Sequence, residues 1–322
     1  MVSVNCKICN QKESAKPYLD YVKSPTIPDE LCVDTFTEKK IYNCESCESC
    51  FVYPSIDNDE LDHFYLTLYK GYPQKINLYH RLLPHFNGRY FSQVLYLKNL
   101  IDMPHCIQVL EIGSNITSVL PALSLLSHKI DFYYFDQVES PIIKKLGGNR
   151  VGSFAKPESI SKKFRENSLD LIHMSHTLEH INPSSLQNMI KKCARTLKER
   201  GYIFIEVPFQ LELKNFYPPH TLFFSTKGLS TLFEGIGFKI IDLQLNNTNK
   251  VMTGRKSGAK KNLFPRIRKF NYLKTRLFKL FLIIFLKVPA LVKFLLKFDY
   301  LSDVIPNDHR PFIRLLAQKA SP

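Results

Sequence analysis

The sequence predicts an α/β fold built around a doubly wound, mostly parallel sheet. From residue 106 onward, short apolar runs of strand length alternate with amphipathic helical stretches, and several runs end in Gly or an acidic residue. Such alternation is typical of parallel strands joined by crossover helices. The 322 residues, of which 44% are hydrophobic and 23% charged, suit one large globular domain and a smaller one.

The expected elements follow in chain order. Apolar and aromatic residues at helical spacing predict two or three helices within 57–105. A helix over 225–237 is expected to begin at a Ser or Thr cap. The predicted strands are 106–113, 131–136, 169–175, 201–208, 237–245 and 312–319, and a further helix covers 184–197.

The N-terminal residues 1–56 are rich in Cys and Pro and poor in long apolar stretches, so a metal is expected to supply what their core lacks. Cys6-x-x-Cys9 and Cys44-x-x-Cys47 offer four thiolates in two pairs, the set that tetrahedral zinc prefers. Cys50 forms a competing pair with Cys47, and the spacing leaves this alternative open.

The remaining cysteines, Cys32, Cys106 and Cys193, are expected to be small core residues. Clustered cysteines without a basic start and an apolar secretory core indicate a reducing compartment, so the protein is expected in the cytoplasm.

Two strand ends predict a nucleotide-type site. In VLEIGSN (109–115), a strand ends at Glu111 and Gly113, and the turn brings backbone amides against a ligand. Asp136 ends the next strand, where a carboxylate accepts hydrogen bonds from ribose hydroxyls. Asn115 in the same turn and Ser175 at the end of a later strand complete the candidate cofactor-binding residues.

The segment LDLIHMSHTLEHI (169–181), followed by a helix and by GYIFIEVP, resembles class I S-adenosylmethionine (SAM)-dependent methyltransferases. Leu178, Glu179 and His180 match the family's LEH segment. The resemblance runs from the Cys pairs through FVYP (51–54), VLEIG (109–113), IEVP (205–208) and HTLFFSTKGLSTLFEGIGF (220–238). It implies a Rossmann-like doubly wound sheet, SAM as cofactor, and similarity to the subgroup with an N-terminal zinc ribbon that includes sugar C-methyltransferases and surface-polysaccharide methyltransferases.

The resemblance also implies which side chains act. His180 and His220 are the candidates for general base or acceptor contact, and His176, one helical turn before His180, is the third. The alternative for each is a histidine that caps a helix or bonds a carbonyl. The sequence departs from the family's E-x-G-x-G-x-G turn, because Asn115 and Thr117 replace two glycines.

The formal charge of +15 is concentrated near the C-terminus. From Lys250 to Lys297 there are fourteen Lys and Arg and no Asp or Glu, interleaved with Leu, Phe and Ile. Its longest uncharged apolar run, seven residues (280–286), is too short to span a bilayer. Residues 260–300 are therefore expected to form a helix that lies on the anionic inner face of the membrane. The alternative is a helical subdomain packed over the active site.

These observations divide the chain into a zinc-ribbon-like module (1–56), a helical lid or linker (57–105), a SAM-binding domain (106–249), a basic amphipathic helical insertion (250–310) and a last strand (311–322). The expected function is SAM-dependent methyl transfer to a small carbohydrate or nucleotide-linked sugar. An RNA methyltransferase or RNA-binding protein is one alternative, disfavoured by the apolar interleaving, and a non-catalytic interaction protein on the same fold is the other.

Overall fold

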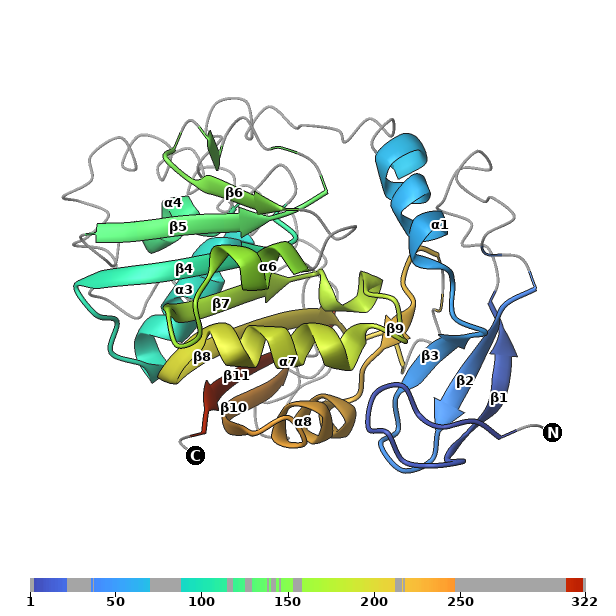
Figure 1. The fold of residues 1–322 in the computed structure, drawn as a ribbon. Helices are drawn as coiled ribbons and strands as arrows, with labels where there is room; N and C mark the ends of the chain where they lie inside the picture. Colours follow the sequence, from blue (N-terminus) through green and yellow to red (C-terminus); the bar gives the residue numbers. More distant parts are fainter. Residues whose placement is uncertain are drawn as a thin grey trace, which may run out of the picture.

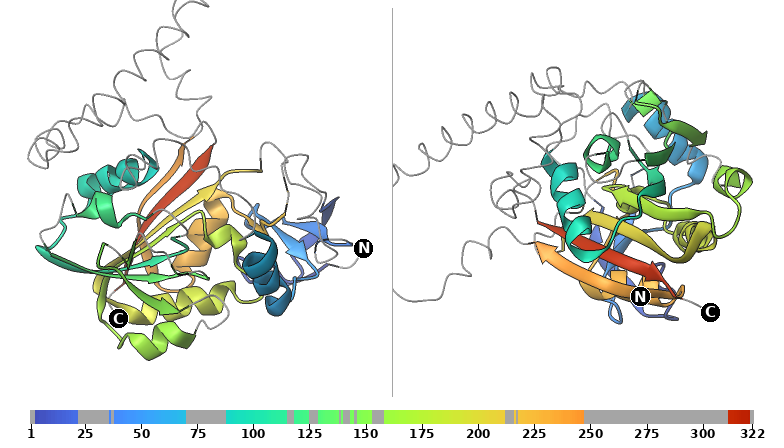
Figure 2. Two further views of the ribbon diagram at one scale, coloured as in Figure 1. Left: turned by 90° about the horizontal axis from the view of Figure 1, so that it is seen from above. Right: turned by 90° about the vertical axis from the view of Figure 1, so that its left-hand side faces the viewer.

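The computed structural model describes residues 3–21, 36, 38–69, 88–114, 118–124, 129–137, 139, 143–144, 146–152, 158–211, 216, 218–246 and 311–320. They form a seven-stranded sheet with helices on both faces and a four-stranded sheet at one end of the molecule (Figures 1 and 2).

The large sheet has the order β10-β11-β8-β7-β4-β5-β6. Strands β8, β7, β4, β5 and β6 are parallel, and β11 lies antiparallel between β8 and β10. The strands are β4 (Cys106–Ile112), β5 (Lys129–Phe135), β6 (Asn149–Gly152), β7 (Leu169–Ser175), β8 (Leu197–Pro208), β10 (Phe238–Asn246) and β11 (Phe312–Lys319). The predicted Rossmann-like α/β fold is confirmed.

Helices cover both faces of this sheet, which explains its apolar strands. Helices α6 (Glu158–Lys163), α7 (Leu186–Thr196) and α8 (Thr226–Glu234) lie in front of the sheet in Figure 1, and α3 (Gly88–Leu100) and α4 (Leu120–Leu123) lie behind it. Buried side chains of each strand divide between these two layers, so that Leu110 packs on the α7 side and Val109 on the α3 side.

Two helices illustrate how sequence determines local structure. In α7, Leu186, Met189, Ile190 and Cys193 are buried, and their spacing of three and four residues places them on one helix face. Helix α8 begins at Ser225, whose side chain accepts a hydrogen bond from the Gly228 amide, as the sequence predicts.

The small sheet joins residues far apart in the sequence. It has the antiparallel order β1-β2-β3-β9, with β1 (Ala15–Asp20), β2 (Lys40–Cys44), β3 (Cys50–Tyr53) and β9 (Leu222–Phe223). Cys50 and Phe51 pair with Phe223 and Leu222. The core of this sheet includes later residues, because Ile41 and Val52 pack in one cluster with Phe216 and Phe223, and Phe51 belongs to the core of the large sheet.

Helix α1 (Asn58–His63) and the π-helical turn η3 (Phe64–Tyr69) connect the two sheets. Phe64 is buried against the small sheet, whereas Asp62 accepts a hydrogen bond from Gln137 just beyond β5. This segment therefore lies beside the carboxyl ends of the parallel strands (Figure 1).

Most predicted elements of the large sheet are observed with small shifts at their ends. Strand β6 was not predicted, because NRVG contains a single β-branched apolar residue. The predicted insertion 250–310 lies outside the described residues. Among the described residues, no helix is long and apolar enough to cross a membrane.

Candidate functional site

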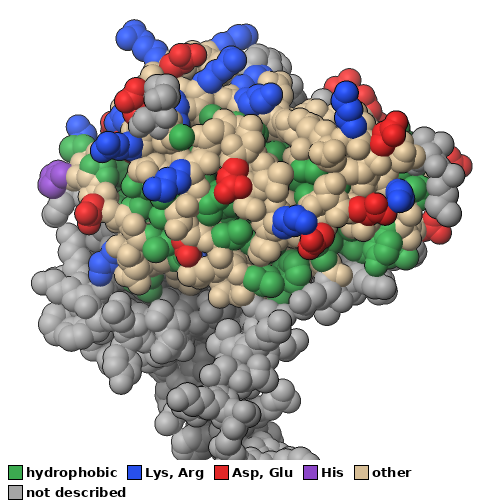
Figure 3. Space-filling model, turned by 90° about the horizontal axis from the view of Figure 1, so that it is seen from below, with side chains coloured by type: hydrophobic (Ala, Val, Ile, Leu, Met, Phe, Trp, Pro, Cys, Tyr) green, Lys and Arg blue, Asp and Glu red, His purple; other side chains and the backbone are tan. Residues whose placement is uncertain are grey.

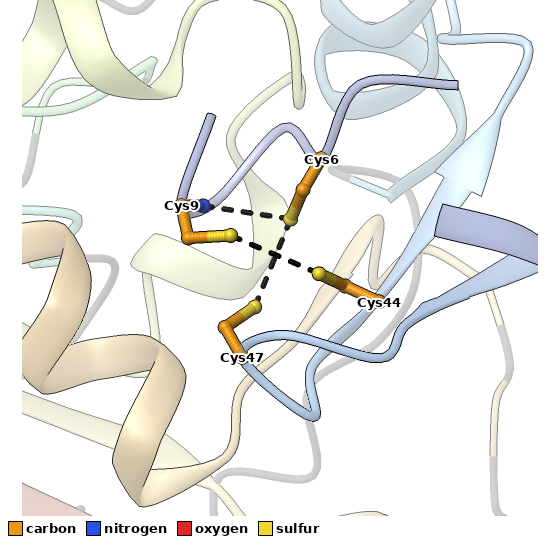
Figure 4. A group of neighbouring side chains, drawn as sticks. All are labelled: Cys6, Cys9, Cys44 and Cys47. Carbon is orange, nitrogen blue, oxygen red and sulfur yellow. Dashed lines mark hydrogen bonds between the residues drawn. The ribbon is translucent and has the colours of Figure 1, made fainter. Parts of the chain in front are cut away.

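Four cysteine side chains converge from the loop before β1 and from the end of β2 with the turn that follows it (Figure 4). The Sγ atoms of Cys6 and Cys47 are 3.7 Å apart, as are those of Cys9 and Cys44, and all four lie within 4.8 Å of one another. Zn–S bonds of about 2.3 Å at tetrahedral angles separate sulfur atoms by about 3.8 Å. The four residues named from the sequence therefore have the geometry of a tetrahedral thiolate site.

Cys50 is not part of this cluster. Its Sγ donates a hydrogen bond to Asn43 Oδ1 at 3.4 Å, and burial raises the pKa of its thiol to about 12. In the cluster itself, a hydrogen bond from Cys6 lowers the pKa of Cys47 to about 5, although burial opposes this. The cluster therefore includes Cys44 and Cys47 but not Cys50, and its role as a set of zinc ligands stays a prediction.

The other cysteines divide. Cys193 is buried in α7, as expected, and burial raises the pKa of its thiol to about 12. The expectation for Cys106 is wrong, because this first residue of β4 projects at the strand's open amino end and is exposed. Cys32 lies outside the described residues.

The cysteine cluster is fastened to the large domain at the start of α8. Ser225 Oγ donates to the Cys47 carbonyl oxygen at 2.6 Å, and the Ser225 amide donates to Ser49 Oγ at 3.0 Å. A Cβ atom on Gly228 would come within 1.9 Å of Ser49 Oγ, so only glycine permits this contact. The four-cysteine cluster is therefore packed directly against the large domain.

The cofactor candidates lie at the carboxyl ends of β4, β5 and β7. Gly113 has φ +77° and a Cβ there would approach Thr177 Oγ1 to 2.0 Å, so glycine allows β4 and β7 to meet closely. Asp136 directly follows β5 and is buried, as predicted for a strand tip. Asn115 and Thr117 lie outside the described residues.

Glu111, at the end of β4, is buried and its oxygens are occupied. Its carboxylate accepts hydrogen bonds from Ser118 Oγ at 2.6 Å and from the Val119 amide at 3.0 Å. The residue thus holds the chain that leads into α4. A direct contact of Glu111 with a cofactor stays a prediction.

Ser175, at the end of β7, belongs to a buried polar network. Ser175 Oγ and Glu206 Oε1 both accept hydrogen bonds from Gln93 Nε2 at 2.8 Å. Arg314 Nε donates to Glu206 Oε2 at 2.5 Å. Burial would raise the pKa of Glu206, but His176 and Arg314 outweigh it and lower the pKa to about 2. The network fixes the ends of β7 and β8 at the carboxyl edge of the sheet.

The three candidate histidines are close together. The rings of His180 and His220 are perpendicular, with centroids 4.7 Å apart. His176 Nδ1 lies 3.6 Å from Glu179 Oε1, and its Nε2 lies 3.5 Å from Glu206 Oε1. The structure thus brings together the three histidines that the sequence analysis named. They surround the carboxylate of Glu179, which the sequence analysis matched to the family's LEH segment without giving it a role.

His180 is held in a defined orientation. Its Nδ1 is 2.8 Å from Tyr65 Oη, and the two rings meet edge to face. Burial, aided by the charge of His176, lowers the pKa of His180 to about 4, so the ring is neutral at pH 7. Tyr65 belongs to η3, so this turn contributes directly to the site.

His220 is positioned by both sheets. Its Nδ1 is 2.6 Å from Gln210 Oε1, and its carbonyl oxygen accepts a hydrogen bond from Tyr21 Oη of the N-terminal module at 2.5 Å. The following residue, Thr221, pairs through its carbonyl with the Val52 amide and through its amide with the Glu179 carbonyl. The small sheet therefore supports the chain that carries His220.

The residues that sequence reasoning missed are the partners of these groups: Gln93, Glu206, Gln210 and Arg314. Glu206 had a visible sign, since a lone carboxylate in the apolar strand GYIFIEVP requires a buried partner.

The fold and the site together define a SAM-dependent methyltransferase of class I. A family model described as a methyltransferase domain matches residues 77–243, more than half of the chain, and the protein belongs to this family. No curated protein matches the chain in sequence.

Several solved structures are similar in fold. A SAM-dependent methyltransferase from Archaeoglobus fulgidus is 20% identical, with coverage of 76% of this chain and 100% of that chain and a TM-score of 0.43. Phosphoethanolamine N-methyltransferase 2 from Haemonchus contortus is 14% identical over 84% of this chain and 63% of that chain, with a TM-score of 0.48. 1,6-Didemethyltoxoflavin-N1-methyltransferase from Burkholderia thailandensis is 12% identical over 88% and 97%, with a TM-score of 0.47.

Proposed function

We propose that this protein transfers the methyl group of SAM to a small acceptor, a carbohydrate or nucleotide-linked sugar. The observation that carries the proposal is the cluster of His176, His180 and His220 at the carboxyl edge of the sheet, the edge at which Gly113 and Asp136 also lie. Open α/β sheets bind ligands at this edge. The sugar-type acceptor is supported by the sequence resemblance alone.

The cofactor site would be formed by Gly113, whose turn lets the backbone approach a ligand, and Asp136, whose carboxylate suits ribose hydroxyls. Bound SAM supplies an electrophilic methyl group on a sulfonium. The protein's contribution is to orient the acceptor in line with that methyl group and to take up or direct the acceptor's proton.

His220 is suited to contact the acceptor. Because Gln210 Oε1 can only accept, His220 Nδ1 carries the hydrogen of their 2.6 Å contact and its Nε2 keeps a lone pair. Neutral His180 lies beside it, with its ring fixed by Tyr65. Both histidines can therefore take up a proton from the acceptor or hold it by a hydrogen bond.

Zinc in the cluster of Cys6, Cys9, Cys44 and Cys47 is part of the proposal. The sulfur spacing, the amides of Ile8 and Cys9 directed at Cys6 Sγ at 3.3 and 3.4 Å, and the burial of three of the four cysteines all suit a structural zinc site. Its role would be to hold the small sheet, and with it the chain before β9, against the large domain.

The test is calorimetric titration of the zinc-loaded chain with SAM and with S-adenosylhomocysteine. A dissociation constant of about 1 μM, or about −8 kcal/mol, is expected for the wild type. Asp136→Ala should abolish binding, whereas Asp131→Ala, at an exposed position near the amino end of β5, should not. Absence of SAM binding by the wild type would favour the alternative of a non-catalytic interaction protein.

The RNA alternative has weaker support. The segment 247–310, which holds fifteen Lys and Arg and three Asp, carries most of the formal charge and lies outside the described residues. On the face shown in Figure 3, the described basic and acidic side chains are interspersed.

A cytoplasmic location with peripheral attachment to the inner membrane face through residues 260–300 is also proposed. Flotation with anionic liposomes tests it: the full chain should float and a chain lacking 260–300 should not. Equal behaviour of the two would exclude this attachment.

A further inference from the structure

A second group of potential metal ligands lies apart from the four cysteines. Glu179 and His180 belong to the turn η4 (Leu178–His180), and His220 lies just before β9. One ligand atom from each of the three residues lies within 4.8 Å of the other two. His180 Nε2 is 3.9 Å from Glu179 Oε1. The group thus offers two imidazoles and one carboxylate around one point.

Glu179 is the least satisfied carboxylate among the described residues of the site. It is 1% exposed, and neither of its oxygens has a hydrogen-bond partner. The two other buried glutamates differ sharply: Glu206 is bonded to Arg314 and Gln93, and Glu111 accepts two hydrogen bonds. A buried carboxylate without partners carries a large desolvation cost, which a bound cation offsets.

The nearest cationic groups do not satisfy Glu179. His176 Nδ1 is 3.6 Å from Glu179 Oε1, beyond hydrogen-bond range, and His176 Nε2 faces Glu206. Arg89 acts on Glu179 only through its charge, and it forms an ion pair with Glu206. His176 is thus shared between Glu179 and Glu206, and neither His176 nor Arg89 donates a hydrogen bond to Glu179.

The histidines have the outer contacts that metal ligands require. Each uses Nδ1 for a neighbour, Tyr65 Oη for His180 and Gln210 Oε1 for His220. Such contacts fix the ring and its tautomer, as the outer contacts of metal-bound imidazoles do.

We propose that Glu179, His180 and His220 bind a divalent transition metal at the acceptor side of the site. Two imidazoles and a carboxylate suit Mn²⁺, Fe²⁺, Co²⁺ or Zn²⁺ better than Mg²⁺ or Ca²⁺, which prefer oxygen ligands. Three protein ligands leave coordination positions open for oxygen atoms of a small molecule.

The catalytic consequence rests on the proposed function. An acceptor hydroxyl bound at an open position would have a lowered pKa and would lose its proton to solvent. Its oxygen would then form a bond to the methyl carbon as the carbon–sulfur bond breaks, with the electron pair leaving on sulfur to give neutral S-adenosylhomocysteine. The favoured acceptors are those with adjacent oxygen atoms that chelate a metal, as in sugar diols.

The experiment measures Mn²⁺ binding to the zinc-loaded full chain at pH 8 by loss of the free-ion electron paramagnetic resonance signal. Mn²⁺ prefers oxygen and nitrogen donors and so leaves the four-cysteine site undisturbed. One Mn²⁺ per chain is expected. Glu179→Gln and His220→Asn should each weaken binding by at least about 100-fold. Glu45→Gln, which removes an exposed carboxylate paired with Lys16, should leave it unchanged.

Thermal unfolding with and without Mn²⁺ provides a second measurement, because a ligand that binds the native state raises its stability. Mn²⁺ should raise the melting temperature of the wild type and not that of Glu179→Gln. Absence of Mn²⁺ binding by the wild type, or equal binding by either ligand variant, would overturn the proposal. SAM binding is measured separately, so its failure would refute the proposed function and leave the metal site standing.

Discussion

The buried ion pair between Glu206 and Arg314 allows a quantitative test of how the last strand is held. The two residues are directly opposite each other in the antiparallel pairing of β8 and β11, with Arg314 Nε 2.5 Å from Glu206 Oε2. Glu206 is 1% and Arg314 6% exposed. Arg314 also donates to Ser92 Oγ at 3.1 Å and lies over the rings of Tyr96 and Phe312.

Removing one partner of such a pair leaves the other charge buried without its main partner, and the loss of a partner from a buried ion pair costs about 3–5 kcal/mol. Arg314→Met and Glu206→Gln should each lower the free energy of unfolding by this amount. The double variant should lose at least about 2 kcal/mol less than the sum of the single losses, because it leaves no uncompensated charge.

The assay is urea unfolding of the zinc-loaded chain, followed by circular dichroism. The exposed pair of Lys16 and Glu45, with side chains 53% and 63% exposed, is the matched control. Replacement of either control residue should cost less than about 1 kcal/mol. If Arg314→Met and Glu206→Gln behave like the control variants, the inferred burial of this pair is refuted.

Three further predictions concern the same structure. The pKa of Glu206 is held at about 2, below its ordinary value near 4.5, so its charged form contributes about 3 kcal/mol to the free energy of unfolding. This contribution is complete above pH 4.5 and is lost as the pH falls toward 2. Acid unfolding of Glu206→Gln should lack this pH dependence. Cys44→Ser should lose bound zinc, measured as metal per chain, whereas Cys50→Ser should retain it; the reverse result would contradict the ligand set. Gly113→Ala should lower both the unfolding midpoint and the affinity for SAM, since its Cβ would meet Thr177 Oγ1 at 2.0 Å and its φ of +77° disfavours alanine; unchanged affinity would separate this turn from the cofactor site.

Local pattern was sufficient to predict six strands of the large sheet, all except β6. These six are apolar runs of strand length, several of them bounded by Gly or acidic residues, and β11 was predicted over the same residues that the structure shows, 312–319. The small sheet was not predicted, because its strands are four to six residues long and its last strand has only two. Pairing of β3 with β9 depends on the tertiary fold, which local periodicity in the sequence does not report.

The candidate site shows the same division. The histidines were identified because LEH and the segment around His220 have a recognisable sequence pattern. Their partners were not, since the contact of Glu206 with Arg314 depends on the register between β8 and β11, and that of His180 with Tyr65 joins residues 115 positions apart. Sequence spacing supplies the reactive groups, and three-dimensional packing supplies the neighbours that set their charge.

The pairing of β3 with β9 also bears on the order in which the chain is synthesised. The cysteine cluster is complete once residue 47 has been made, but the strand that closes the small sheet follows only at Leu222. Until then the edge of β3 that pairs with β9 lacks its partner strand, and unpaired strand edges favour aggregation. A nascent chain or fragment that stops before Leu222 therefore retains an unpaired strand, which makes residues 1–56 a poor choice for expression as a separate unit.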